Sequence, residues 1–380
     1  MRICIVYDCL FPYTVGGGER WYRNVAQRLA ADGHDVTYLT LRQWPKGERG
    51  EIPGVRVVVA GPRMALYGEG GQRRVAPPLV FGAGVLWHLV RHGRSYDVIH
   101  TASFPYFSLL AAALLRPLGR YRIVVDWFEL WSREYWSEYL GPVGGRVGRF
   151  VQGLCLRVAQ RAFCFADLTA GRLREDGLRG EVTVLRGMFS GPETPPVPVP
   201  AAPLVVFAGR HIPEKRAPAV VGAVARVEGV RGLVLGDGPD FELVKAEIER
   251  LGVGDRVSAP GFVPTEQVEQ NLARALCLVL PSRREGYGLV VVEASSLGTP
   301  SVLVRDPDNA ATELIEEGVN GFVVEDASPE ALAAGIERVR EAGPALRAST
   351  ADWYARNAAR LSLAGSIDAV ASSYAASVRT

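Results

Sequence analysis

The sequence predicts an α/β protein that consists of two doubly wound, Rossmann-like domains facing a central cleft. Its 380 residues suggest two domains, because one domain usually takes roughly 100–200 residues. Short apolar runs alternate with helical stretches in both halves, and this alternation is typical of parallel sheets covered by helices. A segment with six prolines, residues 190–203, separates the halves and is typical of an extended linker.

The first half begins with an apolar strand over residues 3–7, a glycine loop over 15–18 and a helix over 20–31. A turn and a second strand follow over 33–40, where hydrophobic and polar residues alternate. Helical stretches then alternate with further expected strands, at 55–60, 98–100, 123–126, 163–165 and 182–185.

The second half repeats this pattern. Strands are expected at 204–209, 233–238, 257–259, 277–281, 301–304 and 321–325. Helices are expected at 218–227, 241–251, 266–274, 289–297 and 311–316, and the Ala-rich segment from 329 onward is helical. We therefore divide the chain into an N-terminal domain, a Pro-rich linker, a C-terminal domain and returning C-terminal helices, over 1–190, 191–203, 204–350 and 351–380.

Charge is unevenly distributed along the chain. Residues 1–190 carry 25 Lys and Arg against 16 Asp and Glu, whereas the remainder carries 18 against 25. Halves of opposite sign indicate separate domains with different partners. No nucleic-acid recognition motif accompanies the basic half, so we expect no nucleic-acid partner.

The composition also indicates the cellular compartment of the protein. Every apolar run is far shorter than the ~20 residues that a membrane-spanning helix needs. The N-terminus is typical of a first strand rather than of a signal peptide, because Asp8 interrupts its short apolar run. The five cysteines form no CxxC pair and lie mostly in apolar segments, which is typical of free thiols in a reducing cytosol. We expect a cytoplasmic protein.

A first candidate site is the loop of Gly16, Gly17 and Gly18, between a strand and a helix. Such a loop lets backbone N–H groups approach a phosphate at the helix N-terminus. Its spacing is not GxGxxG, and the second strand ends without the acid that would bind the ribose of a nicotinamide cofactor. A dehydrogenase is therefore disfavoured, and a tight turn that simply needs glycine is the structural alternative.

A second candidate site is the basic loop that carries Arg210 and Lys215 directly after a strand. Two cations at the carboxyl end of a strand could hold a diphosphate and stabilise the charge that develops as a nucleotide leaves. The alternative is a basic loop that is only solvated. Lys215 is one of three lysines in the chain, which favours a specific role.

The third candidate site combines two acids with the start of a helix. Glu285 lies on a loop after a strand, and Glu293 lies about two turns into the helix that follows. One carboxylate could accept hydrogen bonds from sugar hydroxyls and the other from a ribose diol. Phosphates would lie between them, on the N–H groups of Gly286, Tyr287, Gly288 and Leu289. An acid that stabilises the helix dipole, together with one buried paired Glu, is the structural alternative.

With these motifs the chain resembles the retaining glycosyltransferases of family 4, which have the GT-B fold. The E-x7-E pattern of Glu285 and Glu293 is quite specific when the Arg-x4-Lys loop and the N-terminal glycines accompany it. The resemblance runs nearly end to end, through 16–40, 97–101, 207–215, 234–240, 260–264, 281–302 and 309–324.

The resemblance implies an enzyme of carbohydrate biosynthesis that transfers a hexose from a nucleotide-diphosphosugar to an acceptor hydroxyl with retention. The N-terminal domain would bind the acceptor and the C-terminal domain the donor, with Arg210 and Lys215 on the diphosphate. Glu285 would meet the donor sugar, and Glu293 the ribose. Backbone around Phe262 and Val263 would meet the base, and the glycine loop at 16–18 would close over the phosphates. We expect no cofactor and no metal ion, because the two cations replace the metal.

One departure from the family pattern concerns the strand near 121–126, which usually leads into a His followed by an acid. Here Phe128 occupies the His position and Glu129 the acid position, and Phe cannot donate a hydrogen bond. Asp126 or Glu129 could take the polar role instead. His100 is another candidate for an acceptor or sugar contact, as is His211 beside Arg210.

The acceptor stays open among glycans, lipids and small natural products. The aromatic-rich segment 126–141 could be an acceptor platform or ordinary core. The basic, apolar stretch 144–163 could dock on anionic lipid at the inner membrane face, or be a solvated helix. A sugar-nucleotide epimerase, a phosphorylase and a non-catalytic nucleotide-sugar-binding protein are the alternatives on the same fold.

Overall fold

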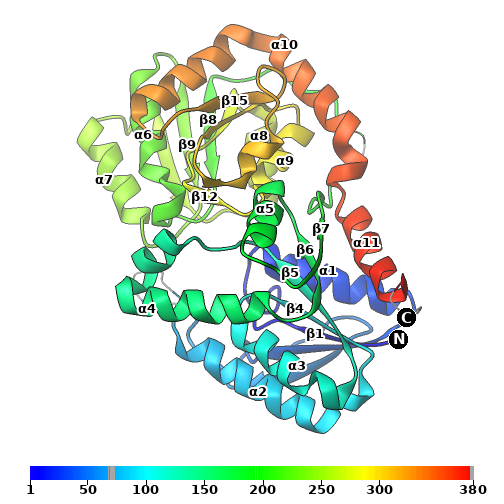
Figure 1. The fold of residues 1–380 in the computed structure, drawn as a ribbon. Coiled ribbons are helices and arrows are strands. Elements are labelled where there is room, and N and C mark those ends of the chain that lie inside the picture. The colour runs from blue at the N-terminus through cyan, green and yellow to red at the C-terminus, as the bar shows by residue number, and fades with distance from the viewer. Residues whose placement is uncertain (67, 69–72, 193, 195, 377–380) are drawn as a thin grey trace. The chain divides into compact units, whose positions relative to one another are not determined.

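The computed structural model describes residues 1–66, 68, 73–192, 194 and 196–376 (Figure 1). The chain divides into two compact units. Of the described residues, unit 1 comprises 1–66, 68, 73–186 and 366–376, and unit 2 comprises 187–192, 194 and 196–365.

Unit 1 is built on a seven-stranded parallel sheet in the order β3-β2-β1-β4-β5-β6-β7. The strand order reverses between β1 and β4, which is the switch point of a doubly wound sheet. Strands β1 and β4 are almost entirely buried, as expected for central strands covered on both faces. The strands are β1 (Arg2–Val6), β2 (Asp35–Leu41), β3 (Arg56–Gly61), β4 (Val98–Ala102), β5 (Arg122–Trp127), β6 (Gln160–Cys164) and β7 (Gly180–Val184).

Helices follow most of these strands. Helix α4 is kinked at Gly141, which has a positive φ of 73° and precedes a proline. The unit 1 helices are α1 (Gly17–Ala31), α2 (Ala76–His92), α3 (Tyr106–Gly119), α4 (Arg133–Leu156), α5 (Asp167–Glu175) and most of α11 (Leu363–Ala376), with a 3₁₀ turn η1 (Gly93–Ser95).

Unit 2 contains a six-stranded parallel sheet in the order β10-β9-β8-β11-β13-β15, whose switch point lies between β8 and β11. Its strands are β8 (Leu204–Ala208), β9 (Arg231–Leu235), β10 (Val257–Gly261), β11 (Cys277–Leu280), β13 (Ser301–Val304) and β15 (Gly321–Val324). A separate pair consists of β12 (Arg284–Glu285) and β14 (Asp308–Asn309). The helices are α6 (Ala217–Arg226), α7 (Phe241–Leu251), α8 (Thr265–Arg274), α9 (Leu289–Ser296) and α10 (Pro329–Leu361), with 3₁₀ turns η2 (Pro213–Lys215) and η3 (Ala310–Leu314).

Each unit therefore has the predicted α/β, Rossmann-like architecture, and one expected helix differs. We expected an α-helix over 311–316, but Ala310–Leu314 form a 3₁₀ turn. Two asparagine side chains bond the backbone here, because Asn309 Oδ1 accepts from the N–H of Ala311 (3.1 Å) and Asn320 Oδ1 from that of Glu316 (2.7 Å). These local bonds replace the α-helical pattern.

The unit boundaries also differ from the expected domain limits. The chain passes from unit 1 to unit 2 at Arg186–Gly187, and the Pro-rich segment packs on unit 2. There the Tyr354 hydroxyl donates to the carbonyl of Pro192 (2.5 Å). Helix α10, including Trp353, belongs to unit 2, so the return to unit 1 begins at Ser366 rather than at 351. Residues 193, 195 and 377–380 of the expected linker and C-terminal segment lie outside the described residues.

Within the described ranges, none of the helices combines the length and the hydrophobicity that crossing a bilayer requires.

Candidate functional site

The expected donor residues of unit 2 lie on loops at the switch point of its sheet. The loop after β8 carries Arg210 and Lys215, and the loop after the neighbouring strand β11 carries Glu285. Ligands of open α/β sheets bind in the crevice where two such loops diverge. Strand order alone therefore brings these two loops together.

Lys215 and Glu285 form an ion pair between the two loops. Lys215 Nζ donates to Glu285 Oε1 at 2.5 Å, and the Ser282 hydroxyl donates to the same oxygen at 2.8 Å. The two charged side chains are only 19% and 11% exposed. A charge pair in such a partly desolvated position interacts more strongly than an exposed one. This pair is the polar centre of the site.

The backbone around the pair is fixed by further bonds. The N–H of Arg283 donates to the carbonyl of Glu214 (2.8 Å), which joins the two loops directly. Strand β12, which contains Glu285, pairs with β14, where Glu285 lies opposite Asn309. Asn309 is buried and its Nδ2 donates to the carbonyls of Ser282 (3.1 Å) and Val304 (2.9 Å). Asn309 was not predicted as a site residue, because nothing in a loop sequence shows that a polar side chain is buried.

Helix α9 begins immediately after this loop. Its N-cap, Gly288, has φ of 93°, and a Cβ there would lie 2.5 Å from Ala311 Cβ, so only glycine fits. The first N–H groups of an α-helix have no partner within the helix, and here they belong to Leu289 and its successors. Glu293 lies one turn further along α9 and is half-buried. The Tyr287 side chain is buried, and burial raises the pKa of its phenol.

The remaining expected site residues of unit 2 differ in their exposure to solvent. Arg210 is exposed, and Phe262, directly after β10, is 74% exposed with Val263 half-buried beside it. His211 is fully buried between Phe207 and Phe241, and burial lowers the pKa of its imidazole. This burial disfavours His211 as a candidate for a substrate contact.

In unit 1, the glycine loop forms the start of α1. Gly16 is its N-cap with φ of −170°, an extended conformation open to any residue. Close packing explains the glycine at position 18, because a Cβ there would lie 2.7 Å from the Tyr7 hydroxyl and 3.6 Å from the Phe128 ring. The loop thus lies beside Phe128, which is half-buried and stacks on Phe165 (ring centroids 5.2 Å apart).

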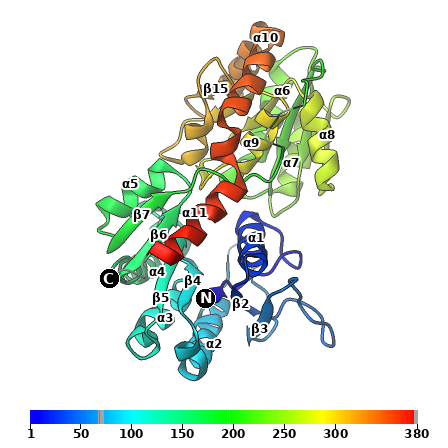
Figure 2. The same cartoon turned by 90° about the vertical axis from the view of Figure 1, so that its right-hand side faces the viewer.

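His100 and Asp126 have no surface for a ligand in this structure. Both are 0% exposed, and His100 Nε2 lies 3.0 Å from Asp126 Oδ2. Trp21 Nε1 donates to the same oxygen (2.7 Å), and the Tyr374 hydroxyl lies 2.6 Å from His100 Nδ1 (Figure 2 shows α11, which carries Tyr374). Their burial disfavours the possible sugar or acceptor contacts of these two residues, which form a buried polar network of unit 1. Glu129 is half-buried and accepts from Trp131 Nε1 (3.2 Å).

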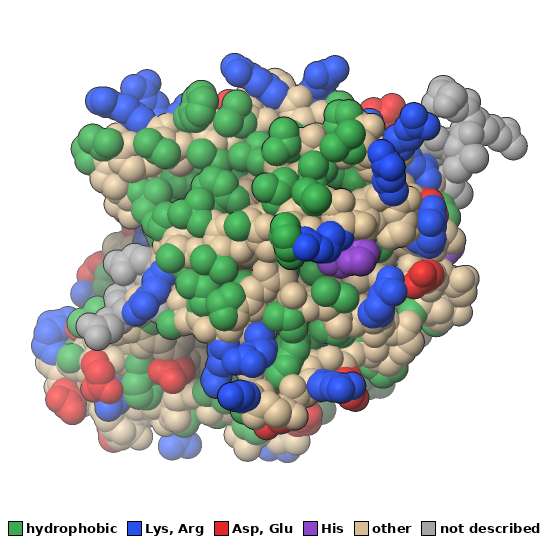
Figure 3. Space-filling model, turned by 90° about the horizontal axis from the view of Figure 1, so that it is seen from below, with side chains coloured by type: hydrophobic (Ala, Val, Ile, Leu, Met, Phe, Trp, Pro, Cys, Tyr) green, Lys and Arg blue, Asp and Glu red, His purple; other side chains and the backbone are tan. Residues whose placement is uncertain are grey.

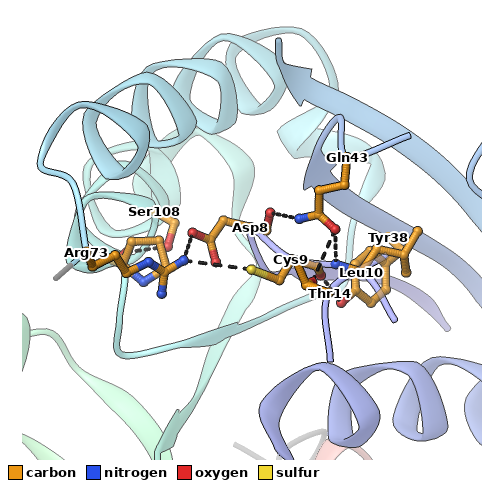
Figure 4. Close-up of polar contacts among 9 residues, drawn as sticks. Asp8, Cys9, Leu10, Thr14, Tyr38, Gln43, Arg73 and Ser108 are labelled. Carbon is orange, nitrogen blue, oxygen red and sulfur yellow. Dashed lines mark hydrogen bonds and ion pairs between the residues drawn. The ribbon is translucent and has the colours of Figure 1, made fainter. Parts of the chain in front are cut away.

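A polar cluster at the switch point of unit 1 was not predicted (Figure 4). Asp8, directly after β1, is completely buried and is ion-paired with Arg73. Gln43 Nε2 donates to the carbonyl of Asp8 (2.7 Å), and Gln43 Oε1 accepts from the N–H of Leu10 (2.7 Å). These bonds fix the loop after β1. The sequence could have indicated Asp8 through its position directly after the first strand.

The aromatic segment 126–141 is mainly core. Trp127, Tyr135 and Trp136 are buried, and Trp136 Nε1 donates to the buried Gln152 (3.0 Å). The acceptor-platform alternative is therefore disfavoured. In the described part of the chain, no three His, Cys, Asp or Glu side chains are grouped so that they could hold a metal ion.

Two family models match the chain, one in each half. The model "Glycosyl transferase 4-like domain" matches residues 16–187, and the model "Glycosyl transferases group 1" matches residues 197–356. The chain belongs to the family 4, group 1 glycosyltransferases.

Curated relatives match about half of this glycosyltransferase chain. The D-inositol 3-phosphate glycosyltransferase of Segniliparus rotundus is 32% identical over 188 residues, which are 47% of this chain and 41% of the relative. The alpha-D-kanosaminyltransferase of Streptomyces kanamyceticus is 32% identical over 177 residues, 45% of each chain. The chain thus spans less than half the length of these relatives.

Solved structures match the chain over nearly its whole length. Sucrose-phosphate synthase from Thermosynechococcus elongatus superimposes with a TM-score of 0.82 at 19% identity, covering 99% of this chain and 98% of the other. HepE from Anabaena, in complex with UDP and glucose, gives a TM-score of 0.74 at 20% identity and covers 99% of both chains. At these identities the likeness confirms the expected GT-B fold and nothing finer.

Proposed function

We propose that this chain is a retaining glycosyltransferase that moves a hexose from a nucleotide-diphosphosugar to an acceptor hydroxyl. The observation that carries the proposal is the Lys215–Glu285 pair at the switch point of unit 2, beside the start of α9. A cation, a carboxylate and the N–H groups at a helix start together match the diphosphate and hydroxyl groups of such a donor.

Each residue takes a role suited to its chemistry. Arg210 and Lys215 hold the diphosphate, and a phosphate oxygen replaces Glu285 as the partner of Lys215 when the donor binds. Glu285 then accepts hydrogen bonds from hydroxyls of the donor sugar. Glu293 accepts from the ribose diol, and the phosphates face the segment of Gly286, Tyr287, Gly288 and Leu289, which leads into α9. The exposed Phe262 and its neighbour Val263 border the base.

The chemistry we propose is front-face transfer. The acceptor oxygen forms a bond to the anomeric carbon on the face from which the nucleoside diphosphate leaves, as the sugar–phosphate bond breaks. The acceptor proton passes to an oxygen of the leaving phosphate, so no protein base is required. Arg210 and Lys215 stabilise the negative charge that develops on this phosphate, a task that a metal ion performs in other enzymes. We therefore propose metal-independent transfer, which adding EDTA should leave unchanged.

The names of similar proteins support this class of substrates. HepE is solved with UDP and glucose, and the curated relatives transfer sugars to small or lipid-linked acceptors by name, such as inositol 3-phosphate and phosphatidylinositol monomannoside. We propose that unit 1 binds a glycan, lipid or small-molecule acceptor near its own switch point. Asp8, which is ion-paired with Arg73, lies on the loop after β1 there.

We also propose a cytoplasmic location. All five cysteines are buried thiols outside any disulfide bond, which suits a reducing compartment.

A transfer assay tests the proposal. The protein is incubated with UDP-, GDP-, ADP- and dTDP-sugars and a panel of glycan, lipid and small-molecule acceptors, and release of nucleoside diphosphate is measured. Proton NMR of the product reports the anomeric configuration. We expect release with one donor class and retained configuration, lost in Glu285→Gln and kept in Glu249→Gln, an exposed acid on α7.

Three outcomes would contradict the proposal in different ways. Equal release of nucleoside diphosphate by the wild type and by Glu285→Gln would show that Glu285 is not part of the active site. An inverted product would refute retention. Conversion of the donor sugar with no acceptor present would indicate an epimerase.

A further inference from the structure

Three neighbouring helices of unit 1 carry large hydrophobic side chains on their outer faces. Trp87 on α2, Leu114 on α3 and Phe150 on α4 are 62%, 69% and 64% exposed. Helices α2 and α3 pack closely, because a Cβ on Gly82 would lie 2.5 Å from Phe107 Cβ, and α3 reaches α4 through the Tyr106–Gln152 hydrogen bond (3.0 Å). We call the resulting surface the apolar face and define it by six exposed residues, Trp87, Val90, Leu114, Val143, Val147 and Phe150.

The exposure follows from the sequence of each helix. Helix α2 buries Phe81, Val85 and Leu89 on one side, yet Trp87 and Val90 on its other side are also apolar. A helix that is apolar on all sides is normally buried on all sides. Among the residues that the structure describes, no apolar segment covers the outer side of α2 where Trp87 and Val90 are exposed. Exposed apolar surfaces of this kind mark interaction sites.

The charges around the apolar face are almost all positive. Helices α2 and α3 contain no acidic residue, and the two acids of α4 lie near its start, before the apolar positions. Arg146 and Arg149 are exposed among the apolar positions of α4, and the Arg91 guanidinium lies over the Trp87 ring, 3.1 Å from its centroid. In Figure 3 hydrophobic side chains gather over much of this side of the molecule, and Lys and Arg side chains lie around them.

An open basic pocket adjoins the same surface. Arg94, Arg120 and Arg122 line it together with the Arg2–Asp97 ion pair. Leu118 lines it too, and its exposed side chain belongs to α3 beside Leu114. The pocket thus offers positive charge next to apolar surface. This combination matches a molecule that has anionic groups beside hydrocarbon.

We propose that unit 1 docks through the apolar face on the surface of an anionic lipid bilayer. The apolar side chains would enter the boundary between headgroups and acyl chains, while the arginines contact lipid phosphates. Trp87 suits this boundary, because its indole is apolar with one polar edge. A second copy of the chain fits less well, because a two-fold contact would bring arginines of one copy against those of the other.

Vesicle flotation tests the proposal with the full chain and without any activity readout, so it does not depend on the proposed transferase reaction. Vesicles of phosphatidylcholine alone are compared with vesicles that also contain phosphatidylglycerol, at low and high salt. The variants are V143S/F150S and R146Q/R149Q. The matched controls are Leu243→Ser, whose side chain on α7 of unit 2 is 58% exposed, and Arg231→Gln, also exposed in unit 2.

We expect binding to the phosphatidylglycerol vesicles that weakens as salt rises. Each arginine near an anionic surface contributes about fivefold to partitioning, so R146Q/R149Q should bind about 25-fold more weakly. V143S/F150S should lose binding to a similar or greater extent, while both controls bind like wild type. Melting temperatures confirm that all variants fold.

Two results would overturn the proposal. One is equal binding by the wild type and both double variants, or no binding to anionic vesicles at low salt. The other is a wild-type dimer in light scattering that V143S/F150S converts to a monomer while vesicles capture neither form. That result would assign the apolar face to a second copy of the chain.

Discussion

Lys215 and Glu285 are 70 positions apart in the sequence, and their charged atoms are 2.5 Å apart in the structure. The pairing follows from sheet topology, because β8 and β11 are neighbours and the loops after them leave the same edge. Both residues were candidates from the sequence, but their direct contact is seen only in the structure. On our account this contact keeps both charges satisfied until a diphosphate takes the place of the carboxylate.

We predict that Lys215→Gln lowers kcat/KM for transfer about 10²–10³-fold, because a positive charge on the leaving phosphate is lost. Lys245→Gln is the matched control, since Lys245 lies on α7 in an exposed pair with Glu242. Steady-state kinetics with saturating acceptor provide the measurement. Equal losses in the two variants would show that the effect is not specific to this loop.

Asn309 offers a test of how the position of Glu285 is maintained. We predict that Asn309→Ala reduces the free energy of unfolding by about 2–4 kcal/mol, because buried carbonyls lose their donors. At a temperature where the variant is still folded, transfer should fall by about 10²-fold as Glu285 shifts. Asn271→Ala on α8, whose side-chain bond is exposed, is the control. Full activity in a destabilised Asn309→Ala protein would limit this residue to a structural role.

The sequence predicts the strands that have a strong apolar pattern. It does not predict short elements that depend on hydrogen bonds from side chains. Strands such as β8 and β11 agree with the expected ranges to within a residue or so, because buried parallel strands are continuous apolar runs. Strands β12 and β14, of two residues each, contain no such run, and their pairing depends on Asn309. The fold class is confirmed, while the roles of the site residues stay predictions.

The sequence also did not show which polar side chains are buried. His100 and Asp126 lie in or at the end of central strands, and nothing in their neighbours shows that Trp21 and Tyr374, from distant helices, enclose them. Arg73, the ion-pair partner of Asp8, was missed for the same reason. Such pairs form between segments that only the folded chain brings together.

Helix α2 should make stability depend on pH through His88. Burial, with smaller effects from His92 and Arg56, lowers the pKa of His88 from 6.5 to about 4. Between these values the unfolded chain binds a proton that the folded chain does not, so stability falls as pH drops from 6.5 towards 4. We predict that His88→Gln reduces this loss, measured as melting temperature against pH. An unchanged profile would contradict the assignment.

At the scale of the whole molecule, the C-terminal segment completes unit 1 although it follows unit 2 in sequence. Ile367, Val370 and Tyr374 of α11 are buried, and the Arg122 guanidinium donates to the carbonyl of Tyr374. Unit 1 is therefore not a continuous stretch of chain. A division of the chain by sequence position alone would separate α11 from the strands that it covers.

We predict that truncation after Gly365 destabilises unit 1 by about 5 kcal/mol or more, because three buried side chains are lost at about 1.5–3 kcal/mol each. Unit 2 should keep its stability. Hydrogen exchange followed by mass spectrometry reads the two units separately: peptides from β4 and β5 should lose protection, while those from β8 and β11 keep it. Unchanged protection of β4 and β5 would show that α11 contributes little.

The central claim is that unit 2 carries a donor site built around Lys215, Glu285 and Glu293. The most direct measurement is thermal stabilisation by a panel of UDP-, GDP-, ADP- and dTDP-sugars, since a ligand at 100 times its Kd stabilises the folded state by about 2.7 kcal/mol. We predict a clear shift with at least one of these donors, lost in Glu293→Ala and kept in the exposed control Glu249→Ala. No shift with any donor, or an equal shift in Glu293→Ala, would contradict the account.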